Sequence, residues 1–260
     1  MQARSTRAIL LRRIAYGDND LIVTLFTPDA GRLTVIAKAA RKSKRRFPGI
    51  LELFSLLEVV YSKGQRGNLP MLKEAVLENA FIHIRNDILK TGYANYWVEL
   101  INIWLPEGKE DPALYLLLKE VLLALDKSCI SSQILTIYFQ MKFLNFAGLK
   151  PSLDACCLCQ IQTGVLDQKK VSLSLRDGGI VCCRCQPSVS ANINFTLSKG
   201  TLKQLIWISE RNLSTAVRVR FSAAGLKEAL EFLESFVPYH VGKVPKSLTF
   251  LRNMRTYNTV

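Results

Sequence analysis

The sequence has few of the residues on which enzymes most often rely, with only two histidines, His83 and His240, far apart in the chain. Histidine is the side chain that ordinarily titrates near neutral pH, so a histidine general base has little support. The motifs G-x-x-x-x-G-K-[ST], G-x-S-x-G and H-E-x-x-H are absent as well. The sequence therefore argues against ATP hydrolysis, serine hydrolysis and zinc proteolysis, and it predicts a protein that is not an enzyme.

Long apolar runs are also missing. No stretch of about 18 uncharged apolar residues occurs, so we expect no transmembrane helix. The chain starts with the polar, basic residues Met1-Gln2-Ala3-Arg4, and no apolar run precedes a cleavage site, so we expect no secretory signal. Together these features predict a cytoplasmic protein that does not span a membrane.

Basic residues outnumber acidic ones, and the excess lies at the two ends of the sequence. The formal net charge is +14, from 35 Lys and Arg against 21 Asp and Glu. Residues 1–50 hold 11 cations against 3 anions, residues 186–260 hold 10 against 4, and residues 51–150 hold 10 against 11. Such an asymmetry favours a polyanionic partner, either nucleic acid or an anionic membrane. A basic surface that serves only solubility is the alternative.

The first 80 residues predict short β-strands. Apolar and β-branched stretches alternate with Asp, Asn, Gly and Pro turns, which gives strands over residues 8–14, 21–27, 32–37, 51–61 and 69–78. Five short strands with turns this close together predict a small barrel. The OB-fold is a five-stranded barrel of about this size and commonly binds single-stranded nucleic acid.

Helices are predicted for most of the remaining chain. Apolar residues recur at helical spacing over residues 84–104, 114–125 and 134–146, and Trp97 and Trp104 are expected to pack in the core. Two more helices are predicted over residues 196–210 and 223–237, with Pro238 ending the second.

The sequence thus predicts an α+β fold in four parts. These are an OB-fold barrel that binds nucleic acid over residues 1–80, a first helical part over 81–151, a small cysteine-rich insert over 152–190, and a second helical part with a basic tail over 191–260.

One segment concentrates positive charge in a loop that connects two strands of the predicted barrel. Six cations fall within nine positions, in a loop between two predicted strands: Lys38, Arg41, Lys42, Lys44, Arg45 and Arg46. Cations of this kind neutralise phosphates and release counterions, so the run predicts nucleic-acid binding. A solvated loop or a localisation signal is the alternative. Phe47 is predicted to anchor the loop to the barrel, in preference to stacking on a base.

Six of the seven cysteines form two clusters, Cys156-Cys157-Leu158-Cys159 and Cys182-Cys183-Arg184-Cys185, while Cys129 lies apart. A C-x-x-C turn lets two thiolates converge on one metal, and a second such turn completes a tetrahedron. The spacing therefore predicts one structural zinc ion per chain. The ligands that give both pairs the same spacing are Cys156, Cys159, Cys182 and Cys185.

The cysteines leave other readings open. A disulfide framework or free thiols are the alternatives to a metal, although disulfides are rare in cytosolic proteins. Cys157 or Cys183 can also replace a neighbouring ligand. Gly178-Gly179 predicts a tight turn just before the second knuckle.

The order of these features resembles the RecO family of bacterial recombination mediators over essentially the whole chain. The resemblance is carried by four stretches of sequence, namely residues 16–27 (YGDNDLIVTLFT), residues 31–42 (GRL followed by AKAARK), residues 148–153 (GLKPSL) leading into the first knuckle, and residues 246–248 (KSL). Family members usually have Glu where Asp18 stands and a glycine near Ala39, and both knuckles here carry an extra cysteine.

The resemblance implies an N-terminal OB-fold, a helical domain and a zinc-knuckle insert. It also implies a non-enzymatic protein that binds single- and double-stranded DNA, anneals complementary strands and helps RecA to load onto strands coated by single-strand-binding protein. The implied partners are RecR and the C-terminal tail of single-strand-binding protein, in the bacterial cytoplasm at the nucleoid. Two other functions stay open: an RNA- or ribosome-associated zinc-ribbon protein, and a metal-dependent nuclease.

Overall fold

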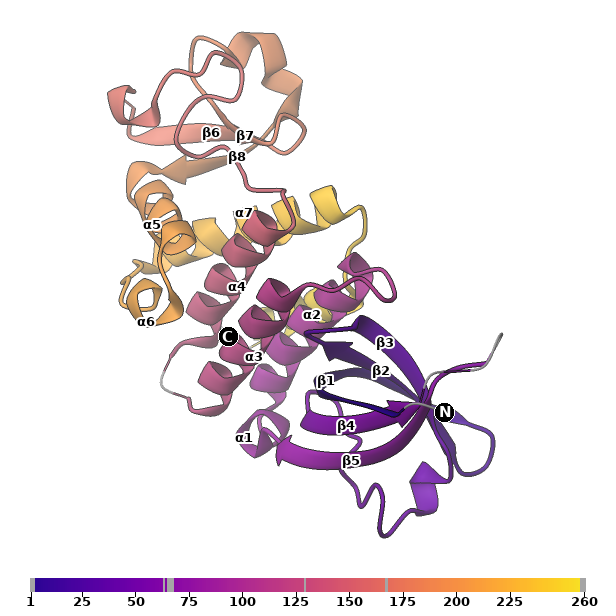
Figure 1. Ribbon diagram of the computed structural model, residues 1–260. Coiled ribbons are helices and arrows are strands. Elements are labelled where there is room, and N and C mark those ends of the chain that lie inside the picture. Colours follow the sequence, from indigo (N-terminus) through magenta and orange to yellow (C-terminus); the bar gives the residue numbers. More distant parts are fainter. Residues whose placement is uncertain (1–2, 63, 65–67, 129, 167, 258–260) are drawn as a thin grey trace. The chain divides into compact units, whose positions relative to one another are not determined.

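The computed structural model describes residues 3–62, 64, 68–128, 130–166 and 168–257 (Figure 1). Cys129, which the sequence places apart from the cysteine clusters, lies outside these residues. The chain divides into two compact units, Met1–Ser128 with Pro245–Val260, and Cys129–Val244. The four-part division predicted from the sequence is finer than this and stays a prediction. Within the described residues, no helix is both long and apolar enough to cross a membrane.

Five strands open the first unit. They pair around a closed ring in the order β1-β2-β3-β5-β4, with all neighbours antiparallel except β3 and β5, which run parallel where Ile36 faces Met71. The five predicted strands are therefore confirmed. Their bounds are β1 Ala3–Tyr16, β2 Asp20–Thr27, β3 Gly31–Ala37, β4 Leu56–Ser62 and β5 Met71–Asn79.

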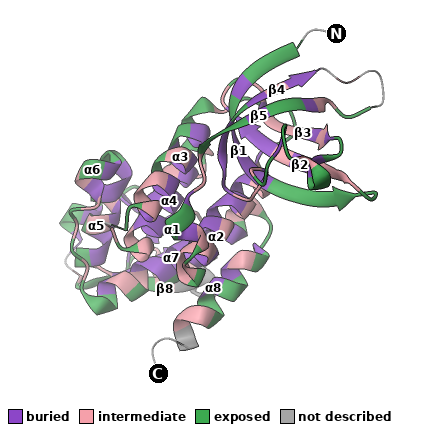
Figure 2. Cartoon of the chain, turned by 90° about the horizontal axis from the view of Figure 1, so that it is seen from below, coloured by how far each residue is buried: buried purple, intermediate pink, exposed green. Residues whose placement is uncertain are grey.

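The inside of the ring is filled by one face of each strand. Because side chains alternate along a strand, apolar residues two positions apart point to the same side. Leu10, Val23, Leu25, Val59 and Leu72 are fully buried there, and Figure 2 shows buried and exposed stretches mixed along these strands.

The fourth strand begins later than the sequence suggests. Residues 51–61 are apolar enough to predict one strand, but the strand starts only at Leu56. Phe54 has a φ of 71°, outside the range of an extended chain, so residues 51–55 form a loop. The loop is tied to β1 because Phe54 N–H donates to the Leu10 carbonyl at 2.9 Å.

Four helices complete the first unit: α1 Ile82–Arg85, α2 Ile88–Trp104, α3 Pro112–Asp126 and α8 Lys246–Tyr257. Asp87 and Asp111 cap α2 and α3 by accepting hydrogen bonds from their first backbone N–H groups. Trp97 on α2 is fully buried, as predicted, whereas Trp104 at the end of α2 is only half-buried. Helix α8 was not predicted. Glu99 on α2 caps it by accepting from the backbone N–H groups of Lys246 at 3.0 Å and Ser247 at 2.9 Å.

The second unit joins four helices to a three-stranded antiparallel sheet with the order β7-β6-β8. Ser198 accepts a hydrogen bond from Thr201 N–H and begins α5. Residues 193–197 before it form strand β8 rather than helix. The bounds are α4 Ser132–Phe146, β6 Lys170–Ser174, β7 Gly179–Val181, β8 Ile193–Ser198, α5 Lys199–Glu210, α6 Leu213–Ala216 and α7 Ala223–Val241.

The prediction that Pro238 ends its helix is wrong, because α7 continues to Val241 with Pro238 inside it. A proline removes one backbone hydrogen bond and its ring crowds the carbonyl four residues earlier, but the residues that follow it can still keep helical backbone angles. The final turn closes normally, since Gly242 N–H donates to the Pro238 carbonyl at 3.0 Å. Gly242 then stops the helix with a φ of 77°.

Candidate nucleic-acid interface and metal centre

The cationic segment, residues 38–46, directly follows β3 and contains a short 3₁₀ turn over Ala40–Lys42. Apolar residues on either side of the cations anchor it to the ring of strands. Ala40, Phe47 and Leu51 all belong to the apolar core that fills the ring. Only 2% of Phe47 is exposed, so the predicted anchoring role is confirmed and its ring is not available to stack on a base.

Asp20 at the start of β2 holds the beginning of the segment. Its carboxylate accepts hydrogen bonds from the Ala39 backbone N–H at 2.8 Å and from the Lys38 ammonium at 2.7 Å. These two bonds, the backbone one first, lower the pKa of Asp20 below its ordinary value. Ala39 itself has a φ of 54°, in the left-handed region that glycine adopts more readily.

Ser43 holds the end of the segment. Its hydroxyl oxygen accepts from the backbone N–H groups of Arg46 at 3.1 Å and Phe47 at 3.0 Å. The Arg46 guanidinium donates to the Lys38 carbonyl at 2.9 Å and lies 5.3 Å from the centroid of the Phe47 ring. The segment is therefore a braced turn, in which side chains replace the regular hydrogen bonds of a helix or strand.

All six predicted nucleic-acid-binding cations are exposed. Among the residues that the structure describes, Lys38 is the one member of the six with an ion-pair partner, Asp20. Arg41 and Arg46 donate to the backbone carbonyls of Asp18 and Lys38, which leaves their charge uncompensated. The structure thus gathers a strong positive charge on one short exposed segment, which suits phosphate contacts.

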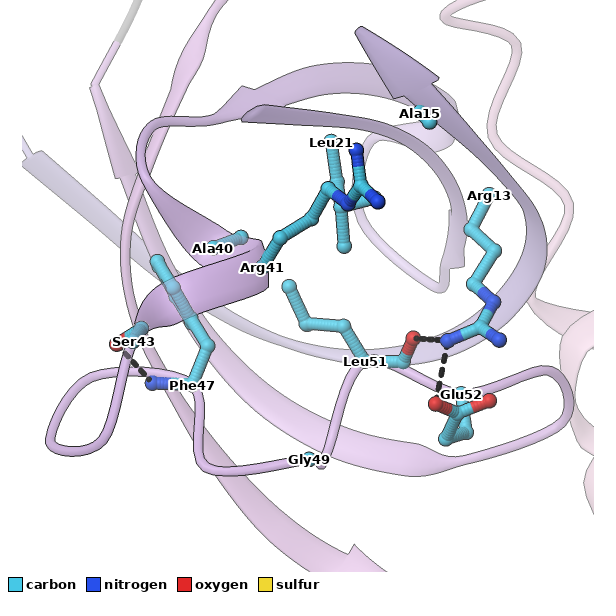
Figure 3. Close-up of a pocket in the computed structure, with 10 residues that line it drawn as sticks. All are labelled: Arg13, Ala15, Leu21, Ala40, Arg41, Ser43, Phe47, Gly49, Leu51 and Glu52. Carbon is cyan, nitrogen blue, oxygen red and sulfur yellow. Dashed lines mark hydrogen bonds and ion pairs between the residues drawn. The ribbon is translucent and has the colours of Figure 1, made fainter. Parts of the chain in front are cut away.

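A pocket of about 410 Å³ opens beside the segment (Figure 3). Its apolar lining comes from Ala15, Leu21, Ala40, Phe47 and Leu51, and Figure 3 shows the Arg41 side chain among the residues that line it. Arg13 on β1 and Glu52 form an ion pair at its rim, and Arg13 also donates to the Leu51 carbonyl at 3.3 Å.

Sequence reasoning missed four residues of this region: Arg13, Asp20, Ser43 and Glu52. Asp20 ends a predicted turn and lies 18 residues before Lys38, so its place in the hairpin before a cationic run was a usable signal. Ser43, three and four positions before the N–H groups it binds, fits a common serine turn pattern. The pairing of Arg13 with Glu52 joins positions far apart in the chain and left no such signal.

The four cysteines predicted as metal ligands lie together in the second unit. The sulfur atoms of Cys156, Cys159, Cys182 and Cys185 are all within 4.8 Å of one another, and Cys159 Sγ is 3.6 Å from Cys182 Sγ. Four thiols at this spacing suit one tetrahedral metal ion with sulfur ligands. The two surplus cysteines, Cys157 and Cys183, are not part of the cluster.

A close backbone approach aligns the two knuckles. Ser152 N–H donates to the Gly178 carbonyl at 3.0 Å, and Ile180 N–H donates to the Ser152 carbonyl at 2.9 Å. A Cβ atom on Gly179 would lie only 2.4 Å from the Ser152 carbonyl oxygen, so this position requires glycine. Cys157 N–H then donates to the Ile180 carbonyl at 2.8 Å and fixes the first knuckle against β7.

The cluster is prepared for a cation. Burial raises the pKa of the Cys156 thiol, but hydrogen bonds from the backbone of Cys159, Cys182 and Leu158 outweigh it and bring this pKa down to about 6. Cys185 has its pKa raised to about 12 because its thiol hydrogen-bonds to Cys159 and Cys182. The pKa of Cys156 is therefore lowered while that of Cys185 is raised. A bound metal ion would favour the thiolate form of all four cysteines.

Comparison with known proteins gives matches along nearly the whole chain. The family model described as "Recombination protein O N terminal" matches residues 1–81, and the one described as "Recombination protein O C terminal" matches residues 85–249. A protein of Desulfatibacillum aliphaticivorans named "DNA repair protein RecO" is 42% identical over 96% of this chain and 97% of its own length. Proteins with the same name from Desulfosudis oleivorans and Syntrophus aciditrophicus are 41% and 32% identical, over 98% and 95% of this chain and 99% and 94% of their own lengths.

Proposed function

The chain belongs to the RecO family of recombination proteins, and from this premise we propose that it is a DNA-binding mediator of recombination and DNA repair. It binds single- and double-stranded DNA, anneals complementary single strands and helps RecA to load onto strands coated by single-strand-binding protein. It acts together with RecR and engages the C-terminal tail of single-strand-binding protein. It catalyses no covalent step and works in the bacterial cytoplasm at the nucleoid, where its DNA partner lies.

The observation that carries this proposal is the exposed cationic segment braced on a ring of five strands. Lys38, Arg41, Lys42, Lys44, Arg45 and Arg46 make the phosphate contacts. Because Asp20, Ser43 and the buried Phe47 hold the segment in shape, its charges are positioned before DNA arrives. Less conformational entropy is then lost on binding. The ring itself is proposed to be an OB-fold, a five-stranded Greek-key barrel that commonly binds single strands.

Zinc is the metal proposed for the cysteine cluster. Cys156, Cys159, Cys182 and Cys185 supply four sulfur ligands, which soft or borderline metals prefer to hard oxygen-seeking ions. Four protein ligands leave no position for water or substrate, so the zinc is structural. It holds the two knuckles together and takes no part in DNA chemistry.

The test is a strand-annealing assay. Two complementary strands, one carrying a fluorophore and the other a quencher, are first coated with single-strand-binding protein. Adding the protein is expected to speed quenching at least about tenfold, and adding RecR is expected to direct the complex toward RecA loading. Annealing no faster than the uncatalysed rate, on both bare and coated strands, would contradict the proposed function.

Two further assays separate the other functions that the sequence left open. In a competition assay, structured RNA that displaces bound single-stranded DNA at equal nucleotide concentration would favour an RNA-associated protein, since a barrel and a basic surface also suit RNA. Incubation of labelled DNA with Mg²⁺ or Mn²⁺ is expected to leave the DNA intact. Cleavage abolished by a single carboxylate substitution would establish a nuclease instead.

A further inference from the structure

The pocket beside the cationic segment has a composition that positive charge alone does not explain. A surface that only attracts phosphates needs exposed cations and no cavity. Here a concave space of about 410 Å³ is lined by Ala15, Leu21 and Leu51, with Arg41 also in its lining and a carboxylate, Glu52, at the rim. An apolar hollow with a few polar groups is the usual form of a small-molecule site, and this volume lies at the lower end of the range of roughly 300 to 1,000 Å³.

We propose that this pocket receives one unstacked base of a bound single strand, with a preference for bases that carry an amino group. The inference rests on the proposed DNA binding and adds a base-reading site to it. A flat base removed from its stack needs apolar contact on its faces and hydrogen-bond partners at its edge.

The apolar walls meet the first need. Leu51 is almost fully buried, and Leu21 packs against the core of the ring while still lining the pocket. Both side chains are therefore fixed by packing before a ligand arrives. The Arg41 guanidinium, which hydrogen-bonds the Asp18 carbonyl and keeps its charge, offers a planar cationic surface to a base and a donor to its phosphate.

Glu52 meets the second need. One of its carboxylate oxygens is held by Arg13, so the orientation of the group is fixed and its negative charge is balanced. Among the described residues, no hydrogen bond or ion pair is made to the other carboxylate oxygen of Glu52, Oε2. A carboxylate accepts readily from the amino group of cytosine. Thymine presents a carbonyl oxygen at the same edge, and the two acceptors would repel.

A salt bridge that fixes a carboxylate beside a phosphate-binding segment is also difficult to explain by phosphate contacts alone. An acidic side chain close to DNA weakens binding to the backbone. Its presence in the pocket rim is consistent with reading a base edge, where an acceptor is useful.

The test measures the affinities for labelled 20-nucleotide oligo-dC and oligo-dT by fluorescence anisotropy at two salt concentrations. The wild-type protein is expected to bind oligo-dC about fivefold more tightly, the effect of one added hydrogen bond of ordinary net strength. In Glu52→Gln the overall affinity for both strands can rise as negative charge is lost, but their ratio should fall to near one. The ratio is the readout because it cancels the general effect of charge.

A second variant blocks the pocket without changing charge. Ala15 is exposed and lines the pocket, so Ala15→Leu places three extra carbon atoms in it and should lower oligo-dC affinity about fivefold. Ala3→Leu makes the same change at another exposed position of β1, outside the pocket, and should leave affinity unchanged. Thermal melts of both variants verify that each is folded.

Equal affinity of the wild-type protein for oligo-dC and oligo-dT, or equal effects of Ala15→Leu and Ala3→Leu, would overturn the base-reading site while leaving DNA binding intact. Absence of binding to both strands at low salt would instead remove the proposed function itself. Free dCMP distinguishes the source of the base. Weak competition by dCMP supports a base presented by a strand, and dCMP binding tighter than the oligonucleotide assigns the pocket to a free nucleotide.

Discussion

The cationic segment of the first unit and the cysteine cluster of the second are both short stretches shaped by backbone hydrogen bonds, but they hold charge in opposite ways. In the segment, like charges are spread over exposed side chains that do not converge on one point. In the cluster, four sulfur atoms within 4.8 Å converge on a single point, and two of them, Cys156 and Cys182, are buried. Removing one cation from the segment should lower DNA affinity by a fraction, because each cation contributes separately. Removing one cysteine from the cluster should abolish metal binding, because the four sulfur atoms act together.

The strongest test of this comparison removes ligands from the cluster. Cys156→Ser with Cys182→Ser should reduce bound zinc from about one ion per chain to almost none. Loss of the metal should cost about 4 kcal/mol of unfolding free energy, because binding energy at a structural site is also folding energy. Elemental analysis and denaturant unfolding measure both effects.

The surplus cysteines provide the matched control. Cys157→Ser with Cys183→Ser makes the same chemical change in the same two knuckles, outside the cluster, and should leave zinc content and stability nearly unchanged. A chelator should lower the melting temperature of the wild-type protein and of this control. Unchanged melting after complete zinc removal would show that the cluster does not stabilise the fold.

Charge reversals in the cationic segment should lower DNA affinity without abolishing it. Reversing Lys42, Lys44 and Arg45 to Glu should lower single-strand affinity about a hundredfold near 0.1 M salt and reduce the salt slope by about 2 units, as expected for three lost phosphate contacts. Stability should hardly change, since these side chains are exposed. Anisotropy titrations at several salt concentrations measure the slope.

Reversal of Lys109, Lys127 and Lys246, which are exposed and lie outside the five strands and the segment, changes the net charge of the first unit by the same amount. If this control lowers affinity and slope as strongly as the first triple variant, binding follows net charge, and the segment is not the interface.

The close approach that aligns the knuckles gives an intermediate effect. Gly179→Ala places a Cβ atom 2.4 Å from the Ser152 carbonyl oxygen, so the backbone must shift, at a cost of about 2 kcal/mol. Zinc affinity should fall with it. Gly164→Ala, where no atom lies within 4 Å of the added Cβ, is the control and should change stability by less than about 0.5 kcal/mol. Equal effects of the two substitutions would show that knuckle alignment tolerates the shift.

The smallest expected effect is a gain. Ala39 adopts the left-handed region at a φ of 54°, which costs a residue with a Cβ atom more than it costs glycine. Ala39→Gly should stabilise the protein by about 0.5 kcal/mol, after the entropy that glycine loses on folding is subtracted. DNA affinity should stay the same because Asp20 and Ser43 still brace the segment. Chemical denaturation detects the change, and a loss of stability would mean that the Ala39 backbone is not strained.

Much of the fold followed from local pattern. The strands β1 to β5 and the helices α2 to α5 were largely predictable because apolar periodicity and turn residues agree along those stretches. The three-stranded sheet β6 to β8 was not predicted, and two helical features were missed as well. Helix α8 is polar on average and takes its cap from Glu99, far away in the sequence, so nothing local marks its start. Helix α7 continues past Pro238 for one short turn and ends only where Gly242 adopts a left-handed conformation, so the proline marks a position near the helix end but not the end itself.

The candidate sites divide in the same way. The cysteine set was predictable because spacing alone decides which sulfur atoms can converge, and the two equal C-x-x-C intervals picked out the four that lie together. The cationic run could also be recognised in the sequence, but the hydrogen bonds and ion pairs that hold it in shape could not. Asp20 and Ser43 act through backbone N–H groups, and the Arg13–Glu52 pair joins β1 to a later loop, which depends on strand pairing.

The capping of α8 by Glu99 has a consequence for how the protein is made. The first unit contains the beginning and the end of the chain, and all of Cys129–Val244 is synthesised between them. Phe250 and Leu251 of α8 pack over Gly92 of α2, so that surface of α2 stays uncovered until residues 250 and 251 have been synthesised. At roughly 5 to 20 residues per second, the delay is on the order of ten seconds. During this interval the nascent chain exposes the face of α2 that α8 later covers.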